Sequence, residues 1–159
     1  MNLIFYLYCL PVENLTIKFW LFEDVKKLKK ILLVDDDEHT NFLNKTIIRH
    51  AKFADEVVSQ IKAEEALKYI AEETRNGNLP DLIFLDINMP LMDGWDFMRE
   101  YARMGLNGVG PKVIMLTSSI NPKDEERAAA IEELSGFRSK PLSYDVLNDI
   151  YDRFFDKEE

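Results

Sequence analysis

Short apolar runs alternate with amphipathic stretches over most of this 159-residue chain. The apolar runs are continuous, which is typical of strands buried on both faces of a sheet. The stretches between them place apolar residues three and four apart, the spacing of helices that bury one face. Strands are predicted at 31–34, 56–59, 82–85, 112–116 and 136–139, and helices at 38–51, 63–74, around 95–102, at 122–134 and at 144–155.

Five strands that alternate with five helices predict an α/β fold with one parallel sheet and helices on both faces. The flavodoxin-like strand order 2-1-3-4-5 is the doubly wound arrangement that we expect, with its switch point between the first and third strands. In the first helix, we expect Phe42, Leu43, Ile47 and Ile48 to form the face that packs on the sheet.

Polar side chains stand where four of the predicted strands end. Asp35 and Asp36 follow the first strand, Asp86 the third, Thr117 the fourth and Lys140 the fifth. Ligands of open parallel sheets gather outside the carboxyl ends of the strands. The sequence therefore predicts one pocket that contains carboxylates, a hydroxyl and an ammonium.

These groups suit a hard divalent cation and a phosphoryl group. Mg2+ prefers oxygen ligands and is usually held by one or two carboxylates, which Asp36 and Asp86 would supply, with the backbone carbonyl of Asn88 as a third oxygen and Asp35 bound through water. The Asp86 carboxylate is a candidate nucleophile that forms an acyl-phosphate. Lys140 would offset charge on the phosphoryl oxygens, and Thr117 would donate its hydroxyl to them.

Each of these residues has an ordinary structural interpretation when taken alone. A single aspartate after a strand is most often a helix cap or a turn former, and we expect Asp37 and Glu38 to cap and charge the first helix. A threonine at a strand end is most often a β-branched filler, and a single lysine most often lies at the surface. The functional interpretation depends on the whole set, in this order, at strand ends.

Composition excludes some classes of partner and site. The formal charge of −9 and the pI near 4.8 argue against direct binding of nucleic acid, which requires a basic surface. The single cysteine, Cys9, permits no intramolecular disulfide. His39 and His50 are too sparse for a histidine metal site, and we expect both to be solvated or half-buried helix residues.

Residues 1–28 form an apolar extension that does not match the rest of the chain. Neither of its apolar patches reaches the roughly 20 residues of a membrane span, and the first lysine, Lys18, comes too late for a secretory signal. The alternatives are an interfacial anchor or an artefact of start-site choice. We favour the artefact, because residues 25–30 lead directly into the first strand; membrane association is not expected.

Four segments of the chain resemble the response-regulator receiver domain, the family of the chemotaxis receiver. They read ILLVDDDEHTN, DLIFLDINMPLMDGWDFM, VIMLTSS and GFRSKPLS, and the resemblance covers roughly residues 29–155. It implies that Asp86 is the phosphoacceptor, that Asp35 and Asp36 form the acidic pair, and that Asn88 gives its carbonyl to Mg2+. Thr117 would be the switch hydroxyl and Lys140 the lysine that pairs with the phosphoryl group.

The resemblance also implies a mechanism of population shift. Phosphorylation would draw Thr117 inward and open a cavity for Phe137, which stands where the family often has tyrosine and which lacks its hydroxyl. Ser119 falls where the family controls access of water to the acyl-phosphate. The fourth helix, fifth strand and fifth helix would change their shared surface, which carries Lys123, Glu125, Glu126, Arg127, Arg138 and Asp152.

A cytoplasmic stand-alone response regulator is therefore expected, with one receiver domain at 29–156 and no output domain. It would receive its phosphoryl group from a sensor histidine kinase or a histidine phosphotransfer protein and pass the signal to a protein partner, or to a second copy of itself through the fourth helix, fifth strand and fifth helix. It would promote its own phosphorylation and dephosphorylation without being a turnover enzyme. Thr40, Asn41 and Asn44 on the first helix are the expected specificity residues.

Two other functions compete with this one. A haloacid-dehalogenase-like phosphatase uses an Asp-x-Asp such as Asp35 to Asp37, but His39 stands where that family has a hydroxyl residue, and Asp86 would go unexplained. A phosphorylation-independent interaction module would keep the fold without the chemistry. The complete set of acids, hydroxyl and lysine argues against it.

Overall fold

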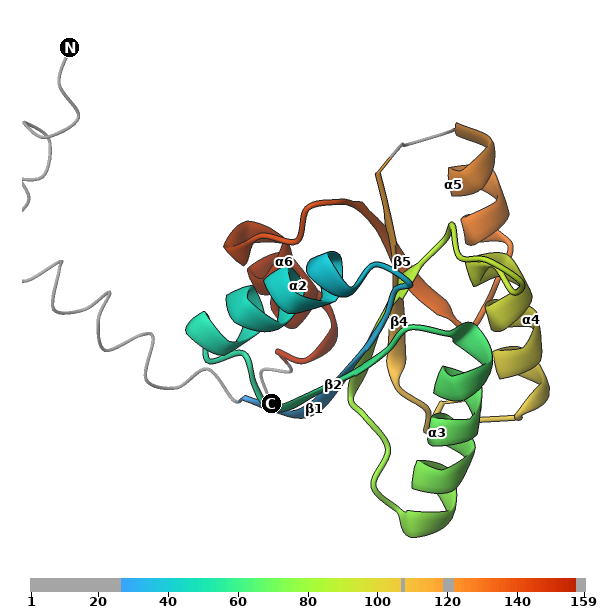
Figure 1. Ribbon diagram of the computed structural model, residues 1–159, viewed down its shortest axis with the longest axis horizontal. Helices are drawn as coiled ribbons and strands as arrows, with labels where there is room; N and C mark the ends of the chain where they lie inside the picture. The colour runs from blue at the N-terminus through green and yellow to red at the C-terminus, as the bar shows by residue number, and fades with distance from the viewer. Residues whose placement is uncertain (1–26, 107, 119–121, 157–159) are drawn as a thin grey trace, which may run out of the picture.

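The structure is a computed structural model that describes residues 27–106, 108–118 and 122–156. Its strands are β1 (Leu28–Val34), β2 (Ala54–Gln60), β3 (Leu82–Asp86), β4 (Lys112–Thr117) and β5 (Leu134–Ser139), and its helices are α2 (Glu38–His50), α3 (Ala63–Asn76), α4 (Gly94–Arg103), α5 (Pro122–Ala129) and α6 (Tyr144–Phe154). The strands form one parallel sheet in the order β2-β1-β3-β4-β5, as predicted (Figure 1).

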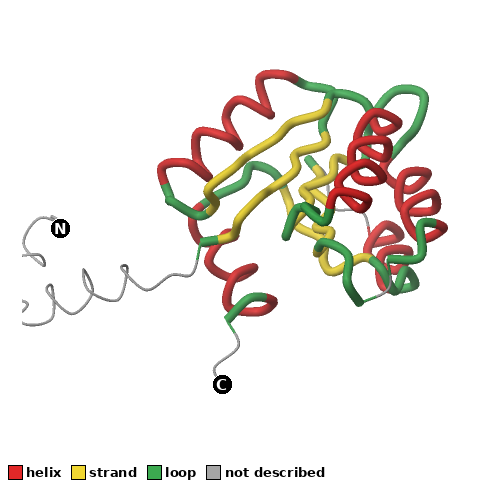
Figure 2. Tube along the Cα trace, turned by 90° about the horizontal axis from the view of Figure 1, so that it is seen from below, coloured by secondary structure: helices red, strands yellow, loops and turns green. Residues whose placement is uncertain are grey.

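Helices cover both faces of this sheet (Figures 1 and 2). Along β1, Ile31 and Leu33 belong to the core on one face, with residues of α2 and α6, while Leu32 and Val34 belong to the core on the other, with residues of α3 and α4. This alternation is the two-residue period of a strand. Because both faces are covered, the central strands β3 and β4 are apolar at nearly every position, as the continuous runs in the sequence indicated.

Side-chain caps fix where the helices begin next to the carboxyl ends of the strands. Asp37 is the N-cap of α2 and accepts a hydrogen bond from the amide of His39 at 2.9 Å, which confirms the predicted cap. Asp93 caps α4 in the same way, accepting from the amide of Asp96 at 2.7 Å. These caps hold the turns after β1 and β3 that carry the candidate site.

Helix α5 is shorter than predicted. The apolar spacing of Ala128, Ile131 and Leu134 favoured a helix to residue 134, but the helix ends at Ala129 and a turn follows. Leu134 instead begins β5, where it pairs with Val113 of β4. Ile131 and Leu134 still pack on the core, so the apolar pattern marked core-facing positions correctly and assigned the wrong element.

The predicted inner face of α2 is also partly wrong. Phe42 and Leu43 are 68% and 59% exposed, whereas Asn41, Asn44 and Ile48 are the buried residues of this helix. Asn41 and Asn44 therefore cannot act as the surface specificity residues that were expected from the sequence. His39 and His50 are both exposed, as expected.

Most of the apolar extension lies outside the described residues, together with Cys9, so its origin stays a prediction. Within the part of the chain that the structure describes, no helix is long and apolar enough to cross a membrane.

Candidate functional site

The predicted site residues meet at the carboxyl ends of the strands, an end of the sheet that we call the site edge, because their strands are neighbours in register. Val34 of β1 pairs with Leu85 of β3, so Asp35 follows beside Asp86. Asp86 in turn pairs with Leu116 of β4, and Thr117 is the next residue along that strand. Asp35 and Asp86 therefore lie side by side, although about 50 residues separate them in the chain, because β1 and β3 are neighbours in the sheet.

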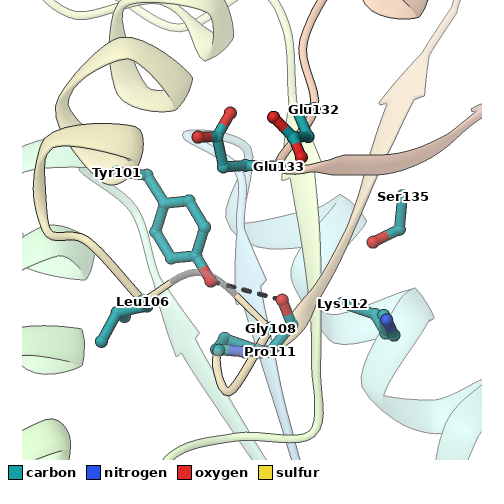
Figure 3. A pocket seen from close by; sticks show the side chains of 9 residues that line it. Tyr101, Leu106, Gly108, Pro111, Lys112, Glu132, Glu133 and Ser135 are labelled. Carbon is teal, nitrogen blue, oxygen red and sulfur yellow. Dashed lines mark hydrogen bonds between the residues drawn. The ribbon is translucent and has the colours of Figure 1, made fainter.

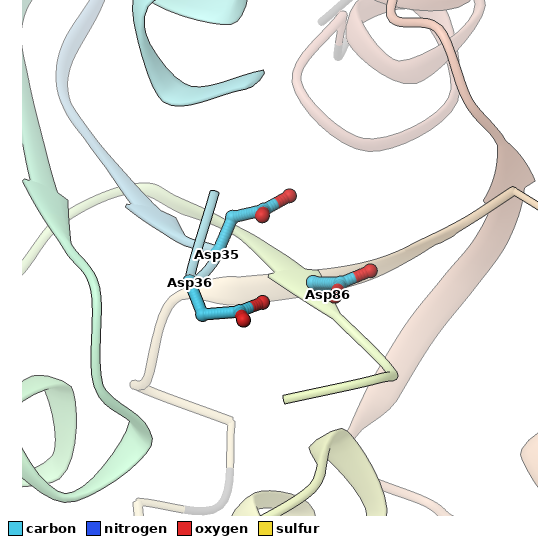
Figure 4. Close-up of side chains that lie close together, drawn as sticks. All are labelled: Asp35, Asp36 and Asp86. Carbon is cyan, nitrogen blue, oxygen red and sulfur yellow. The ribbon is translucent and has the colours of Figure 1, made fainter. Parts of the chain in front are cut away.

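Three carboxylates gather at this edge (Figure 4). Asp35, Asp36 and Asp86 each offer an oxygen atom, and these three atoms lie within 4.8 Å of one another. Asp35 and Asp86 are buried, and Asp36 is exposed. The cluster therefore has a protected inner side and an outer side that is open to a ligand.

Lys140 joins the cluster from the end of β5. Its Nζ lies 2.6 Å from Oδ2 of Asp35 and 2.9 Å from Oδ1 of Asp86. Its backbone amide donates to the carbonyl oxygen of Thr117 at 2.6 Å, which fixes the lysine to the end of β4. This ammonium holds the two buried carboxylates together.

The electrostatics of the cluster follow from burial and from this ion pair. Burial raises the pKa of Asp35, and the hydrogen bonds from Lys140 and from the Asp37 amide only partly oppose the rise. For Lys140, burial acts to lower the pKa, but the hydrogen bonds to Asp35 and Asp86 outweigh it and the pKa is raised. The raised pKa of Lys140 keeps its ammonium charged, whereas the raised pKa of Asp35 reflects the cost of burying a carboxylate.

The charge balance fits a divalent cation. Three carboxylates against one ammonium leave an excess of two negative charges in a partly buried site, and crowded carboxylates are costly without a cation to neutralise them. All the donor atoms are oxygens, which is the preference of Mg2+ and not of softer metals. The residues present therefore fit the predicted Mg2+.

The remaining predicted residues lie close to this edge in the chain. Thr117 is 2% exposed at the end of β4. Phe137 is half-buried on β5, beside Met115 of β4, and packs on the core that faces α3 and α4. Asn88 is exposed in the loop two residues after Asp86, and its carbonyl as a ligand stays a prediction. Ser119 lies outside the described residues.

Two residues support the site in ways that the sequence did not predict. Gly94 begins α4 so close to β3 that a Cβ atom on it would lie 2.6 Å from the carbonyl oxygen of Asp86. Asn41 of α2 donates from Nδ2 to the carbonyl oxygen of Asp35 at 2.7 Å. The role of Gly94 had a signal in the sequence, namely a glycine at a helix start after a short loop. The role of Asn41 had no local signal, since it depends on how α2 packs against the end of β1.

A separate polar pocket lies at the other end of the strands, next to the amino ends of β4 and β5 (Figure 3). It has a volume of about 240 Å³ and is lined by Tyr101, Leu106, Gly108, Gly110, Pro111, Lys112, Glu132, Glu133 and Ser135. The Tyr101 hydroxyl donates to the carbonyl oxygen of Pro111 at 3.3 Å. Lys112 and Ser135 stand at the starts of β4 and β5, so this pocket contains none of the predicted site residues.

Comparison with known proteins agrees with this arrangement. Residues 31–152 match the family model of the response regulator receiver domain. The chain is 29% identical over 127 residues to the chemotaxis protein CheY of Halobacterium salinarum, covering 77% of this chain and 96% of that protein. It is 29% identical over 135 residues to hybrid signal transduction histidine kinase L of Dictyostelium discoideum, covering 83% of this chain and 8% of that protein.

A solved structure gives the same answer. The two component response regulator from Cytophaga hutchinsonii is 32% identical, superposes with a TM-score of 0.76, and is matched over 83% of this chain and 100% of its own. The family is one of signalling domains and not of turnover enzymes, so the phosphatase alternative loses its support. The chain belongs to the response regulator receiver domain family of two-component systems.

Proposed function

We propose that this protein accepts a phosphoryl group on Asp86 in a Mg2+-dependent reaction and then signals to a partner through a changed surface. The observation that carries this proposal is the shared ion pair at the sheet edge. Lys140 contacts both Asp35 and Asp86, while Asp36 completes a set of three carboxylates with two excess negative charges. A structural ion pair alone would not need three carboxylates for one ammonium.

The metal would be held by the carboxylates of Asp36 and Asp86 and by the Asn88 carbonyl, with Asp35 bound through water. When bound, Mg2+ supplies positive charge to the phosphoryl oxygens. The protein supplies the rest: the buried Asp86 carboxylate is held in place by its ion pair with Lys140, and the strand that carries it is paired with β1 on one side and β4 on the other.

In the transfer itself, one oxygen of Asp86 forms a bond to phosphorus as the bond from phosphorus to the donor breaks. The Lys140 ammonium, already 2.9 Å from Oδ1 of Asp86, would then pair with the phosphoryl oxygens. Thr117 stands at the end of the adjacent strand and would donate its hydroxyl to the same group. Charge compensation from both sides is the main contribution that a protein makes to phosphoryl transfer.

The signal would pass along β4 and β5. Thr117 and Phe137 lie on these neighbouring strands, so an inward movement of Thr117 leaves space toward which the Phe137 ring can turn. The output surface would be α5, β5 and α6, where Lys123, Glu126, Arg127 and Asp152 are exposed and Arg138 pairs with Asp149. A homodimer through this surface is one form that the output can take.

The donor would dock on α2. This helix begins directly after the acidic pair, and Phe42 and Leu43 in its second turn expose large apolar side chains. A sensor histidine kinase or a histidine phosphotransfer protein must reach Asp86 over this edge, and apolar surface is the usual centre of a protein interface. Such a donor places the chain on the cytoplasmic side of the membrane.

Phe42→Ser tests the docking part separately from the chemistry. Because the side chain is 68% exposed, the substitution should change the free energy of unfolding by only about 0.5 kcal/mol. Transfer from a phosphohistidine donor should slow, while phosphorylation by acetyl phosphate should proceed at the wild-type rate. Equal slowing with both donors would contradict docking at Phe42.

The central experiment is intact-mass measurement after incubation with acetyl phosphate and Mg2+. We expect one phosphoryl group on the wild type, none with EDTA, and none on Asp86→Asn. Asp37→Asn is the matched control: it also removes an acidic group next to the cluster but keeps a good helix cap, so it should be phosphorylated normally. A folded wild type that binds Mg2+ and gains no phosphoryl group, with a partner that binds wild type and Asp86→Asn equally, would establish a phosphorylation-independent module instead.

A further inference from the structure

Helix α2 buries amides and exposes hydrocarbons. Asn41 is 4% exposed, whereas its neighbours Phe42 and Leu43 are mostly exposed. Burial of an amide has a free-energy cost that only hydrogen bonds offset, and burial of apolar side chains is favourable. Stability alone would favour the opposite arrangement, so the buried amide of Asn41 calls for another explanation.

The hydrogen bonding of Asn41 is one-sided. Its Nδ2 donates to the carbonyl oxygen of Asp35 at 2.7 Å, but its Oδ1 is buried and has no hydrogen-bond partner among the described residues. Because the Asp35 carbonyl oxygen can only accept a hydrogen bond, the NH2 group of Asn41 must face it, and Oδ1 must point the other way. A buried acceptor without a donor costs about 1–3 kcal/mol. The Asn41 side chain is therefore not optimised for stability. Its one hydrogen bond, to the Asp35 carbonyl, is the contribution that it makes.

That bond acts on the peptide unit between Asp35 and Asp36. The carbonyl of Asp35 and the amide of Asp36 form one rigid plane, so holding the carbonyl oxygen sets the direction in which the chain leaves β1. The other polar groups of Asp35 are held as well: its amide donates to the Gln60 carbonyl at 3.2 Å, Oδ1 accepts from the Asp37 amide at 3.0 Å, and Oδ2 contacts Lys140.

Asp36 differs from Asp35, because its carboxylate is exposed. Its place in the cluster depends on the direction of the backbone that carries it. The Asn41 bond links this backbone to the first turns of α2, between residues six apart in the chain. The orientation of the peptide plane between residues 35 and 36 thus depends on how α2 packs on the sheet.

We propose that Asn41 is a positioning residue for the metal site: by fixing the Asp35–Asp36 peptide plane, its Nδ2 directs the Asp36 carboxylate toward the bound cation. This inference rests on the proposed Mg2+ site and adds a residue that contacts no metal or phosphoryl group. Residues that orient metal ligands typically change metal affinity by about 10–100-fold when they are replaced.

The test compares Asn41→Leu with Asn44→Leu by calorimetric titration with MgCl2. Both residues are buried on the same face of α2, at 4% and 5% exposure. Leucine branches at the same carbon as asparagine but cannot hydrogen-bond, so the added volume is common to both variants and the pair isolates the bond to Asp35. We expect Asn41→Leu to weaken Mg2+ binding about tenfold and Asn44→Leu to leave it at the wild-type value. Phosphorylation of Asn41→Leu by acetyl phosphate should be slow at low Mg2+ and recover at saturating Mg2+.

Urea unfolding confirms that each variant is folded, and Asn41→Ala, which adds no volume, replaces Asn41→Leu if that variant does not fold. Wild-type Mg2+ affinity in a folded Asn41 variant would overturn the inference while leaving the proposed function intact. Equal weakening in both leucine variants would also overturn it, since the effect would then belong to the packing of α2. A folded wild type that binds no Mg2+ would remove the proposed metal site and, with it, the inference.

Discussion

Gly94 provides a direct way to disturb the position of Asp86 without touching its side chain. It is the first residue of α4 and its amide donates to the Ile87 carbonyl at 2.8 Å, which ties the helix to the end of β3. A Cβ atom at this position would lie 2.6 Å from the Asp86 carbonyl oxygen and 2.9 Å from the Ile87 Cα atom. Both neighbours are backbone atoms, so no side-chain rotation can relieve the overlap.

The size of the effect of Gly94→Ala follows from these distances. Carbon and oxygen come into contact at about 3.3 Å, so α4 and the end of β3 must separate by roughly 0.7 Å from the 2.6 Å in the structure. Forced overpacking of this kind costs about 1–3 kcal/mol of unfolding free energy. A displacement approaching about 1 Å near reacting groups lowers rates up to about 100-fold, so we expect phosphorylation by acetyl phosphate to slow by about 10- to 100-fold.

The matched control is Gly105→Ala just beyond the other end of the same helix. Gly105 has a φ of +67°, and no atom lies within 4 Å of the position that a Cβ atom would take there. Alanine at this position therefore costs about 1 kcal/mol through backbone strain alone and should leave the phosphorylation rate unchanged. Urea unfolding and intact-mass time courses measure both effects. A Gly94→Ala protein as stable as wild type and phosphorylated at the same rate would refute the close-approach argument.

Three further predictions concern stability. Leu91 is 94% exposed at a φ of +69°, so Leu91→Gly should raise the unfolding free energy by up to about 1 kcal/mol, and a measured loss in urea would contradict this. Burial raises the pKa of Tyr101 from 10.0 to about 12, with the charge of Glu133 adding to the rise. The native chain therefore keeps a proton that the unfolded chain loses, and stability should fall as pH rises from 10.0 toward about 12. Tyr101→Phe should show a smaller fall in urea midpoint over that range, and an identical fall would exclude Tyr101 as its source. Lys30 is buried and its Nζ lies 2.5 Å from Oε2 of Glu73, so Lys30→Met should cost about 1–3 kcal/mol; adding Glu73→Gln should recover part of that loss, and no recovery would contradict the pairing.

The sheet and the place of the site could be predicted because their signals are local. A strand buried on both faces must be continuously apolar, and the polar residue that ends it marks the edge where ligands gather. The polar residues at the strand ends therefore agreed with the predicted strand order and located the site. They are Asp35, Asp86, Thr117 and Lys140. The cap at Asp37 was equally local, since it depends on one side chain and an amide two residues away.

The parts that could not be predicted depend on tertiary contacts. In α2 the apolar residues at 42, 43, 47 and 48 are spaced like a core face, but the helix docks with Asn41 on the strand end, which turns Phe42 outward. Leu134 continues the helical spacing of α5, yet its pairing with Val113 places it in a strand. Neither the hydrogen bond of Asn41 nor the pairing of Leu134 leaves a signal in neighbouring residues.

The most direct measurement for the central claim is to locate the phosphoryl group. Borohydride reduces an acyl-phosphate of aspartate to homoserine, which tandem mass spectrometry assigns to one residue. After incubation with acetyl phosphate and Mg2+, homoserine at position 86, and at neither Asp35 nor Asp36, is the predicted result. Homoserine at Asp35 or Asp36 with residue 86 unchanged would contradict the account.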